Sequence, residues 1–375
     1  KWYLCSVLND TSIDPVFSTV HKSEAEKMTT GFKTIPIIDI SSLVAKIDDP
    51  KQAEDFDVQH AVRQLHNVCR ETGFFYVVFS FSIHYHLATP IVFSPQKGHG
   101  ISDSLMKDVR IIARTFFALP DAEKLKIKMT SATGYRGYQK IGENVTQGSP
   151  DMHEAIDCYK EIKPGMYGSL GKALEGSNLW PQHPPNTKAK MEEYIRACTE
   201  LSRKIMRGVS LALSGSSDVL ERSISSDPFW VLRIIGYPEL PSTECNSLDR
   251  TRIGCGAHTD YGLLTLVNQD DYVTALQVRN VSGEWVEAPP VPGTFVCNIG
   301  DMLKIWSNGL YESTLHRVVN DVSTYRVCVA YFYEPAYDAS VEPYPLCTTN
   351  SGGVRKFDAA VYGDHLVRKV VTNFV

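Results

Sequence analysis

His258-Thr259-Asp260 is a short stretch whose side chains could supply ligands to a metal ion. On an extended strand, residues i and i+2 point to the same face, so His258 and Asp260 could reach one ion. Alone the pattern is weak, because a His-x-Asp sequence is more often a hydrogen-bonded polar pair than a ligand site. A second histidine in a similar context is needed before a metal is indicated.

His316 supplies that context further along the chain, in the strand-like run Leu315-His316-Arg317-Val318. Two imidazoles and one carboxylate on one face, with other positions left open, form the facial triad of non-haem Fe(II) oxygenases. A structural zinc site would use four closed ligands, and no fourth candidate lies at a suitable spacing. The set therefore favours iron over zinc, with His258, Asp260 and His316 as the candidate ligands.

Arg326 lies in the next strand-like run, Tyr325-Arg326-Val327-Cys328, among apolar neighbours. A buried guanidinium in such surroundings needs an anionic partner. That partner could be a structural carboxylate of the protein. Beside a metal triad, a co-substrate that carries a carboxylate becomes the better candidate.

The elements that must position these side chains are short β-type runs separated by turn signals such as Ser282-Gly283 and Asn308-Gly309. The expected strands are Phe229–Ile235, Leu263–Val267, Ala275–Arg279, Trp285–Ala288, Phe295–Ile299, Leu303–Ile305, Leu315–Val319 and Tyr325–Tyr333. About eight strands at this spacing predict a closed or double-sheet all-β unit.

Apolar residues at helical spacing predict helices before and after this unit. The expected helices are Asp55–Glu71, Ser102–Phe117 with Ser102 as the N-cap, Thr187–Leu213 and Asp358–Val371. The expected regions are a leader over 1–27, a mostly helical region over 28–228, a β core over 229–340 and a C-terminal helical region over 341–375.

Composition excludes some functions. The net charge of −5 argues against a nucleic-acid binder driven by bulk charge. The nine cysteines are an odd number without a C-x-x-C pair, which argues against a disulfide framework and indicates a reducing compartment. We found no candidate membrane span or secretory signal, and we expect a cytoplasmic monomer with no nucleic-acid or membrane partner.

Two segments look foreign to the rest. Residues 1–27 show no period, and a convincing start follows at Met28. Val78–Gln96 is apolar without a helical period and interrupts a junction between Gly73-Phe74-Phe75-Tyr76-Val77 and Lys97-Gly98-His99-Gly100. A Val codon begins with GT and a Gln codon can end in AG, the two ends of an intron. We therefore expect Val78–Gln96 to be translated intron sequence, which transcript sequencing would check.

Several stretches resemble the plant and fungal 2-oxoglutarate/Fe(II)-dependent dioxygenases of the isopenicillin-N-synthase-like superfamily. They are IPIIDIS, GFFYV with KGHGI, GYRGYQ, LRIIGYP, GAHTDYGLLTLVNQD, LQVRNVSGEWVEAPPVPGTFVCNIGDMLKIWSNGLYESTLHRVV and YRVCVAYFYEP. The resemblance implies a mainly β fold with flanking helices around a double-stranded β-helix (jelly roll). It also implies iron on His258, Asp260 and His316.

The resemblance assigns co-substrate residues as well. Arg326 falls on the arginine that binds the distal carboxylate of 2-oxoglutarate, and Tyr237 falls on the second tyrosine of the family's N-Y-Y-P motif, which hydrogen-bonds the same carboxylate. Ile235 and Gly236 replace the first half of that motif. Cys328 stands where the family's R-x-S motif has serine, and because a thiol is a weaker donor, we expect looser co-substrate binding.

The implied activity is oxidation, with hydroxylation expected, of a small molecule, coupled to conversion of 2-oxoglutarate and O2 to succinate and CO2. The implied cofactor is Fe(II), and ascorbate is a further candidate, as reductant. Two alternatives stay open: an oxidase of the same fold that uses no 2-oxoglutarate, and a non-catalytic jelly roll that binds a ligand. Succinate formation separates the first alternative, and an intact triad argues against the second.

Other polar candidates carry weaker signals. His153-Glu154 is not an H-E-x-x-H metal motif, because residue 157 is Asp, and an ordinary hydrogen-bonded histidine is expected there. In the implied fold Tyr135, Arg136 and Tyr138 lie near the mouth of the pocket. They could touch substrate, but a packing role for the tyrosines is equally compatible with the sequence.

Overall fold

The computed structural model describes residues 31–78, 101–239, 253–320 and 324–373. The segment 1–30, with the expected leader, and residues 79–100, with all but the first residue of the expected insert, lie outside the described residues. Val78 itself ends strand β2 (Phe74–Val78), is buried, and pairs with Asp39. Within the described part, Phe32 onward forms one compact unit.

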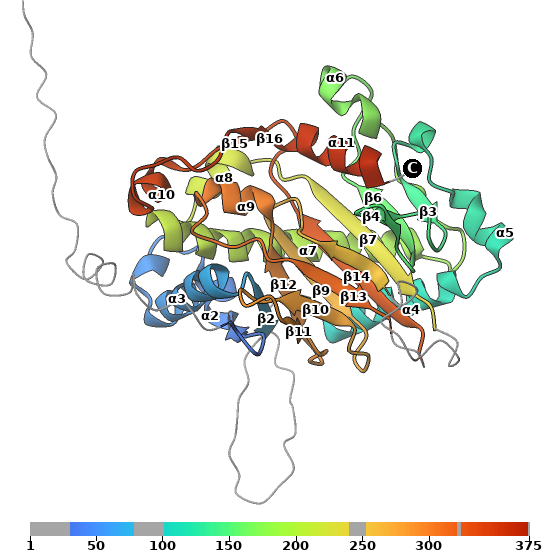
Figure 1. The fold of residues 1–375 in the computed structure, drawn as a ribbon, viewed down its shortest axis with the longest axis horizontal. Helices are drawn as coiled ribbons and strands as arrows, with labels where there is room; N and C mark the ends of the chain where they lie inside the picture. Colours follow the sequence, from blue (N-terminus) through green and yellow to red (C-terminus); the bar gives the residue numbers. More distant parts are fainter. Residues whose placement is uncertain (1–30, 79–100, 240–252, 321–323, 374–375) are drawn as a thin grey trace, which may run out of the picture. The chain divides into compact units, whose positions relative to one another are not determined.

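Two sheets form the centre of this unit (Figure 1). The major sheet has the order β1 (Ile37–Asp39), β2, β12 (Phe295–Ile299), β9 (Leu264–Gln269), β14 (Arg326–Tyr333), β7 (Trp230–Tyr237), β6 (Glu154–Tyr159) and β3 (Gly137–Gln139). The minor sheet has the order β11 (Trp285–Glu287), β10 (Leu276–Arg279), β13 (His316–Val319) and β8 (Ile253–His258). Neighbouring strands are antiparallel except β1 and β2, which run parallel.

The described chain also contains helices and two small two-stranded sheets. The helices are α2 (Ser41–Lys46), α3 (Phe56–Glu71), α4 (Asp103–Phe117), α5 (Asp121–Lys124), α6 (Gly168–Gly171), α7 (Thr187–Ser214), α8 (Val219–Ile224), α9 (Asp301–Trp306), α10 (Pro345–Asn350) and α11 (Tyr362–Asn373). These sheets are the hairpin of β4 (Val145–Thr146) with β5 (Ser149–Pro150), and the pair of β15 (Ser340–Val341) with β16 (Ala360–Val361), which α10 separates in the chain. Helices α2, α3, α4 and α7 pack together, and α4 and α7 also contact β14.

Strand β14 shows how the sheet separates core from cavity. Successive side chains of a strand point to opposite faces. Val327, Val329 and Tyr331 are buried in the main hydrophobic core, whereas Arg326, Cys328 and Ala330 line a cavity. The same strand therefore anchors the helical layer on one face and supplies functional side chains on the other.

The predicted ends of three helices are confirmed where the sequence has a capping residue. The Asp55 side chain accepts hydrogen bonds from the first turn of α3, and Ser102 caps α4 in the same way. Gly215 ends α7 in the left-handed conformation expected of a C-terminal cap. The predicted strand Phe295–Ile299 is β12 itself.

One predicted strand is wrong. Leu303–Ile305 lies inside the helix α9, because Met302, Leu303 and Trp306 are buried at helical rather than alternating spacing. Strand β6 had no matching prediction, although it carries residues that line the cavity.

The predicted regions 28–228, 229–340 and 341–375 are not separate compact units in the structure. Strands β1, β2, β3 and β6 come from the first region, yet they extend the same sheet as β7, β9, β12 and β14. In the described residues, no helix is both long and apolar enough to cross a membrane.

Candidate metal centre and cofactor pocket

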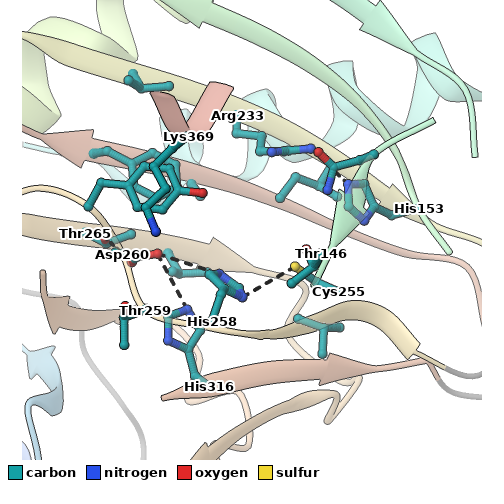
Figure 2. A pocket seen from close by; sticks show the side chains of 18 of the residues that line it. Thr146, His153, Arg233, Cys255, His258, Thr259, Asp260, Thr265, His316 and Lys369 are labelled. Carbon is teal, nitrogen blue, oxygen red and sulfur yellow. Dashed lines mark hydrogen bonds and ion pairs between the residues drawn. The ribbon is translucent and has the colours of Figure 1, made fainter. Parts of the chain in front are cut away.

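A cavity of about 670 Å³ opens between the two sheets. Its lining comes from β6, β7, β9 and β14 of the major sheet, from β8, β10 and β13 of the minor sheet, and from α11. His258, Asp260 and His316 lie within it, and Figure 2 shows their side chains pointing toward one another. The structure therefore brings together the three predicted metal ligands, which we call the triad.

The triad atoms converge on a small volume. His258 Nε2 lies 3.7 Å from Asp260 Oδ1, and His316 Nε2 lies 3.6 Å from the same oxygen. One candidate ligand atom from each residue lies within 4.8 Å of the others. Two imidazole nitrogens and one carboxylate oxygen match the donor set of a non-haem iron site.

Hydrogen bonds on the far side of each ligand fix its orientation. His258 Nδ1 lies 2.7 Å from the carbonyl oxygen of Gly256, and His316 Nδ1 lies 3.1 Å from that of Thr314. Since a carbonyl accepts only from a protonated nitrogen, each Nδ1 carries a hydrogen atom, and each Nε2 is the ring nitrogen that faces the triad centre. Nε2 is therefore the atom that each histidine offers to a metal.

The carboxylate of Asp260 is oriented in the same way. Its Oδ2 accepts hydrogen bonds from Thr265 Oγ1 and Asn298 Nδ2, each at 2.5 Å, which leaves Oδ1 for the triad centre. Burial alone would raise the pKa of Asp260, but the facing His316 and His258 lower it below its usual value. Burial and the facing His258 also lower the pKa of His316, to about 4.

Asp260 differs from the prediction in one respect. Strand β8 ends at His258, so Asp260 lies in the loop after the strand and not at its i+2 position. Its place is set instead by the backbone hydrogen bond from Asp301 N to Asp260 O and by the side chains of Thr265 and Asn298. Sequence reasoning missed Thr265 and Asn298, which carry no local signal.

Arg326 lies at the end of β14 opposite Tyr237 of β7. Its guanidinium carbon lies 4.9 Å from the centroid of the Tyr237 ring, and Nη2 donates to Gln269 Oε1 at 3.0 Å. Nε and Nη1 are buried without a hydrogen-bond partner in the described structure. Two orphaned donors on a buried cation are what a bound carboxylate would satisfy.

Cys328 lies two residues further along β14, on the same face as Arg326. It is 3% exposed and lines the cavity together with Tyr237. The structure thus places all three predicted co-substrate residues side by side on strands β7 and β14.

A second charged group lines the cavity on β6 and β7, and sequence reasoning missed it. Asp157 of β6 faces Arg233 of β7 in the strand register, and Arg233 Nη2 lies 3.0 Å from His153 Nε2. Burial and the neighbouring Arg233 lower the pKa of His153 to about 4, and its Nδ1 lies 2.6 Å from the Gly254 carbonyl oxygen. Arg233 lies between Leu232 and Ile234, so the argument applied to Arg326 could have found it.

Tyr135, Arg136 and Tyr138 do not line the cavity. Arg136 is fully buried and donates to the carbonyl oxygens of Gly134, Leu174 and Lys160. The Tyr138 hydroxyl donates to Glu154 at 2.6 Å. These contacts give Arg136 and Tyr138 a packing role.

Comparison with known proteins agrees with this site. A family model described as the 2OG-Fe(II) oxygenase superfamily matches residues 227–335. A model described as the N-terminal region of a non-haem dioxygenase in morphine synthesis matches residues 96–183. A Glycine max protein named homoarginine-6-hydroxylase 2-ODD-C23 is 59% identical over 93% of this chain and 99% of its own length. The chain belongs to the 2-oxoglutarate/Fe(II)-dependent oxygenase superfamily.

Further relatives of this oxygenase include an Oryza sativa protein named homoarginine-6-hydroxylase 2-ODD-233. It is 58% identical over 93% of this chain and all of its own length. Among solved structures, a full-length Neurospora crassa protein in complex with alpha-KG has a TM-score of 0.71 and 25% identity, covering 92% of this chain and 98% of that one. JOX2 in complex with 2OG, Fe and JA has a TM-score of 0.68 and 25% identity, covering 96% and 97%.

These likenesses confirm the predicted fold, a jelly-roll core with flanking helices, and the predicted class, an oxidoreductase of the dioxygenase type. Fe(II) is the metal cofactor of the family, and 2-oxoglutarate and O2 are its co-substrates. The triad's donor set and the orphaned nitrogens of Arg326 fit iron and a dicarboxylate respectively. The chain is therefore an Fe(II)/2-oxoglutarate-dependent dioxygenase of a small molecule, and the two alternative functions are set aside.

Proposed function

We propose that this dioxygenase hydroxylates L-homoarginine at carbon 6, the side-chain carbon bonded to the guanidino group. The observation that carries the proposal is the identity of 58% and 59%, over nearly their whole length, to relatives named homoarginine-6-hydroxylases. A cavity that carries side chains of both charges is compatible with a substrate that has an ammonium, a carboxylate and a guanidinium group.

The triad residues His258, Asp260 and His316 hold the iron in this proposal. Support comes from the convergence of their free nitrogen and oxygen atoms and from the hydrogen bonds behind each ligand. A bound Fe(II) supplies oxidative decarboxylation of 2-oxoglutarate coupled to oxidation of a substrate C–H bond. The protein contributes fixed ligands and a cavity enclosed by two sheets.

Arg326 binds the distal carboxylate of 2-oxoglutarate, in our proposal, through its unpartnered Nε and Nη1. Tyr237 supports the guanidinium with its ring face. We assign its hydroxyl, which contacts the Cys328 thiol, to the same carboxylate. Cys328 lines the same part of the cavity with a weak thiol donor. Orienting the co-substrate is therefore the function of this end of β7 and β14.

The proposal is tested with the purified chain, Fe(II), 2-oxoglutarate and ascorbate, whose role as reductant stays a prediction. L-Homoarginine should be consumed with formation of succinate and of a product that carries one added oxygen atom. Hydroxylation at carbon 6 gives a hemiaminal, so guanidine release should be followed as well. The matched controls are arginine, whose side chain is one methylene shorter, and lysine, which lacks the amidino group. Succinate formation that does not depend on homoarginine would overturn the substrate assignment.

A cytoplasmic location, a monomeric state and the absence of a nucleic-acid partner are also proposals. The net charge of −5 supports the last of them. The cysteines in the described part of the chain are free thiols, most of them buried, which supports a reducing compartment. Cell fractionation and light scattering of the purified chain are the tests.

A further inference from the structure

Asp157 and Arg233 form an incomplete ion pair in the wall of the cavity. They face one another on the adjacent strands β6 and β7, and both line the cavity. Arg233 Nε lies 3.4 Å from Asp157 Oδ1, which counts as an ion pair without being a hydrogen bond. The residues lie outside the triad and away from Arg326, because Arg233 lies in the middle of β7 while Arg326 is aligned with Tyr237 at its end.

Asp157 lacks the hydrogen bonds that a buried carboxylate normally makes. It is 2% exposed, and its Oδ1 has no hydrogen-bond partner in the described structure. An unsatisfied carboxylate at such a depth is costly, and the cost is relieved when a donor arrives. The missing donor fits a cationic group of a ligand in the cavity.

Arg233 is anchored on one side and open on the other. Its Nη2 reaches His153 Nε2 at 3.0 Å and Gln139 Oε1 at 3.4 Å. Its Nη1 makes no hydrogen bond within the described residues, and the side chain retains 20% exposure toward the cavity. The buried, neutral His153 thus holds the guanidinium in place while N–H groups remain for an anion.

We infer that this pair binds the α-amino acid head of the substrate, the ammonium at Asp157 and the carboxylate at Arg233. The inference rests on the proposed function, which makes the substrate an α-amino acid. In such a molecule the ammonium and carboxylate groups are attached to one carbon atom. A carboxylate and a guanidinium side by side on neighbouring strands offer the complementary arrangement.

The register of the major sheet gives a scale for the separation between Arg233 and the strand that holds Asp260. Arg233 aligns with Ala330 of β14, which aligns with Val267 of β9, the strand whose Thr265 holds Asp260. Two strand spacings amount to about 10 Å. Four carbon–carbon bonds separate the α-carbon from carbon 6, or about 5 Å in an extended chain. The difference between these two lengths leaves room for the contacts of the substrate with the pair at one end and with the metal at the other. An α-amino acid head bound at Arg233 therefore directs carbon 6 toward the triad.

The opposite orientation fails on the same geometry. A guanidino group seated on Asp157 would hold carbon 6 beside the pair, whereas Thr265 and Asn298, which fix Asp260, lie on β9 and β12, two and three strands away from β7. Asp157 and Arg233 therefore select the head of the substrate, and the guanidino group lies nearer the metal.

The test compares L-homoarginine with its analogue without the α-amino group and its analogue without the α-carboxylate. Binding is measured by calorimetry with 2-oxoglutarate and Mn(II) in place of iron, and kcat/KM is measured with Fe(II). In the wild type, either deletion should weaken binding by about 10- to 150-fold, the range of one charge-assisted interaction. The variants are Asp157→Asn, Arg233→Met and, as a rescue that keeps the charge, Arg233→Lys.

The expected result is a crossed pattern. Asp157→Asn should bind homoarginine and the analogue without the amino group equally well, yet still discriminate against the analogue without the carboxylate. Arg233→Met should show the reverse, and Arg233→Lys should restore part of the carboxylate preference. Asp227→Asn, the same change at an exposed carboxylate outside the cavity, should leave every preference intact.

Other outcomes overturn the inference. If the variants bind homoarginine and both analogues more weakly by the same factor, the pair has only a structural role. If the wild type binds and oxidises homoarginine, but Asp157→Asn still prefers homoarginine to the analogue without the amino group, the inference is refuted and the proposed function stands. A wild type that neither binds nor oxidises homoarginine would refute the proposed function and the inference together.

Discussion

Replacing Arg326 with alanine should weaken 2-oxoglutarate binding without removing the metal site. The side chain has two buried nitrogens, Nε and Nη1, that have no partner in the described structure, and a third that is bonded to Gln269. A carboxylate at that place would gain a charge-assisted interaction of about 1.5–3 kcal/mol. Its loss corresponds to about a 10- to 150-fold increase in the Kd of 2-oxoglutarate.

Calorimetric titration of 2-oxoglutarate into the Mn(II)-loaded protein measures this Kd directly. Arg326→Lys keeps the charge but loses the planar fork, so its Kd should lie between those of the wild type and the alanine variant. Arg222→Ala is the matched control, because Arg222 has a 70% exposed side chain, pairs with Asp218 and lies outside the cavity.

The metal affinity of Arg326→Ala should equal that of the wild type, since Arg326 contacts no triad residue. A Kd for 2-oxoglutarate within about twofold of the wild type, a difference under 0.5 kcal/mol, would refute the assigned role. Weakening of metal and 2-oxoglutarate binding to the same extent would instead indicate general damage to the cavity.

Four further predictions concern the same cavity. Alanine in place of any member of the triad should abolish iron binding and turnover while the protein stays folded; an unchanged iron stoichiometry in metal analysis would contradict the ligand set. Asn298→Ala removes one of the two donors to Asp260 Oδ2 and should weaken metal binding by about 10- to 100-fold in a competition titration. Cys328→Ser should tighten 2-oxoglutarate binding by up to about tenfold, the contribution of one neutral hydrogen bond. Calorimetry that shows no gain in affinity would contradict the prediction that the thiol limits co-substrate binding. Because the pKa of His153 is lowered from 6.5 to about 4, its ring stays neutral in the fold as pH falls while the unfolded chain takes up a proton. Stability is therefore lost as pH falls from 6.5 toward 4, by about 2 kcal/mol at pH 5, and denaturant unfolding of metal-free His153→Gln should show a smaller loss than the wild type.

Local signals carried much of the prediction. The caps at Asp55, Ser102 and Gly215 predicted where helices begin or end, because each satisfies backbone groups of the adjacent turn. Arg326 could be singled out because a guanidinium within an apolar strand requires a partner. The triad was readable because its ligands come from two short motifs with characteristic neighbours.

Features that depend on contacts between distant parts of the chain could not be predicted from local sequence signals. Leu303 was expected in a strand, but it lies in the helix α9. The three residues predicted as that strand are too few to distinguish a helical from a strand period. The packing of Met302 and Trp306 against the core decides for the helix. Strand β6 exists because β7 and β3 pair with it, and that pairing brings Asp157 beside Arg233.

The sequence alone determined which residue types could bind iron and 2-oxoglutarate, because ligand chemistry is a property of individual side chains. Only the tertiary structure decided what stands behind and beside them. Thr265 and Asn298 fix the carboxylate of Asp260 from strands β9 and β12, and His153 holds Arg233 across the sheet. These contacts join residues far apart in the chain, and their geometry is set by strand register and burial, which no local pattern specifies.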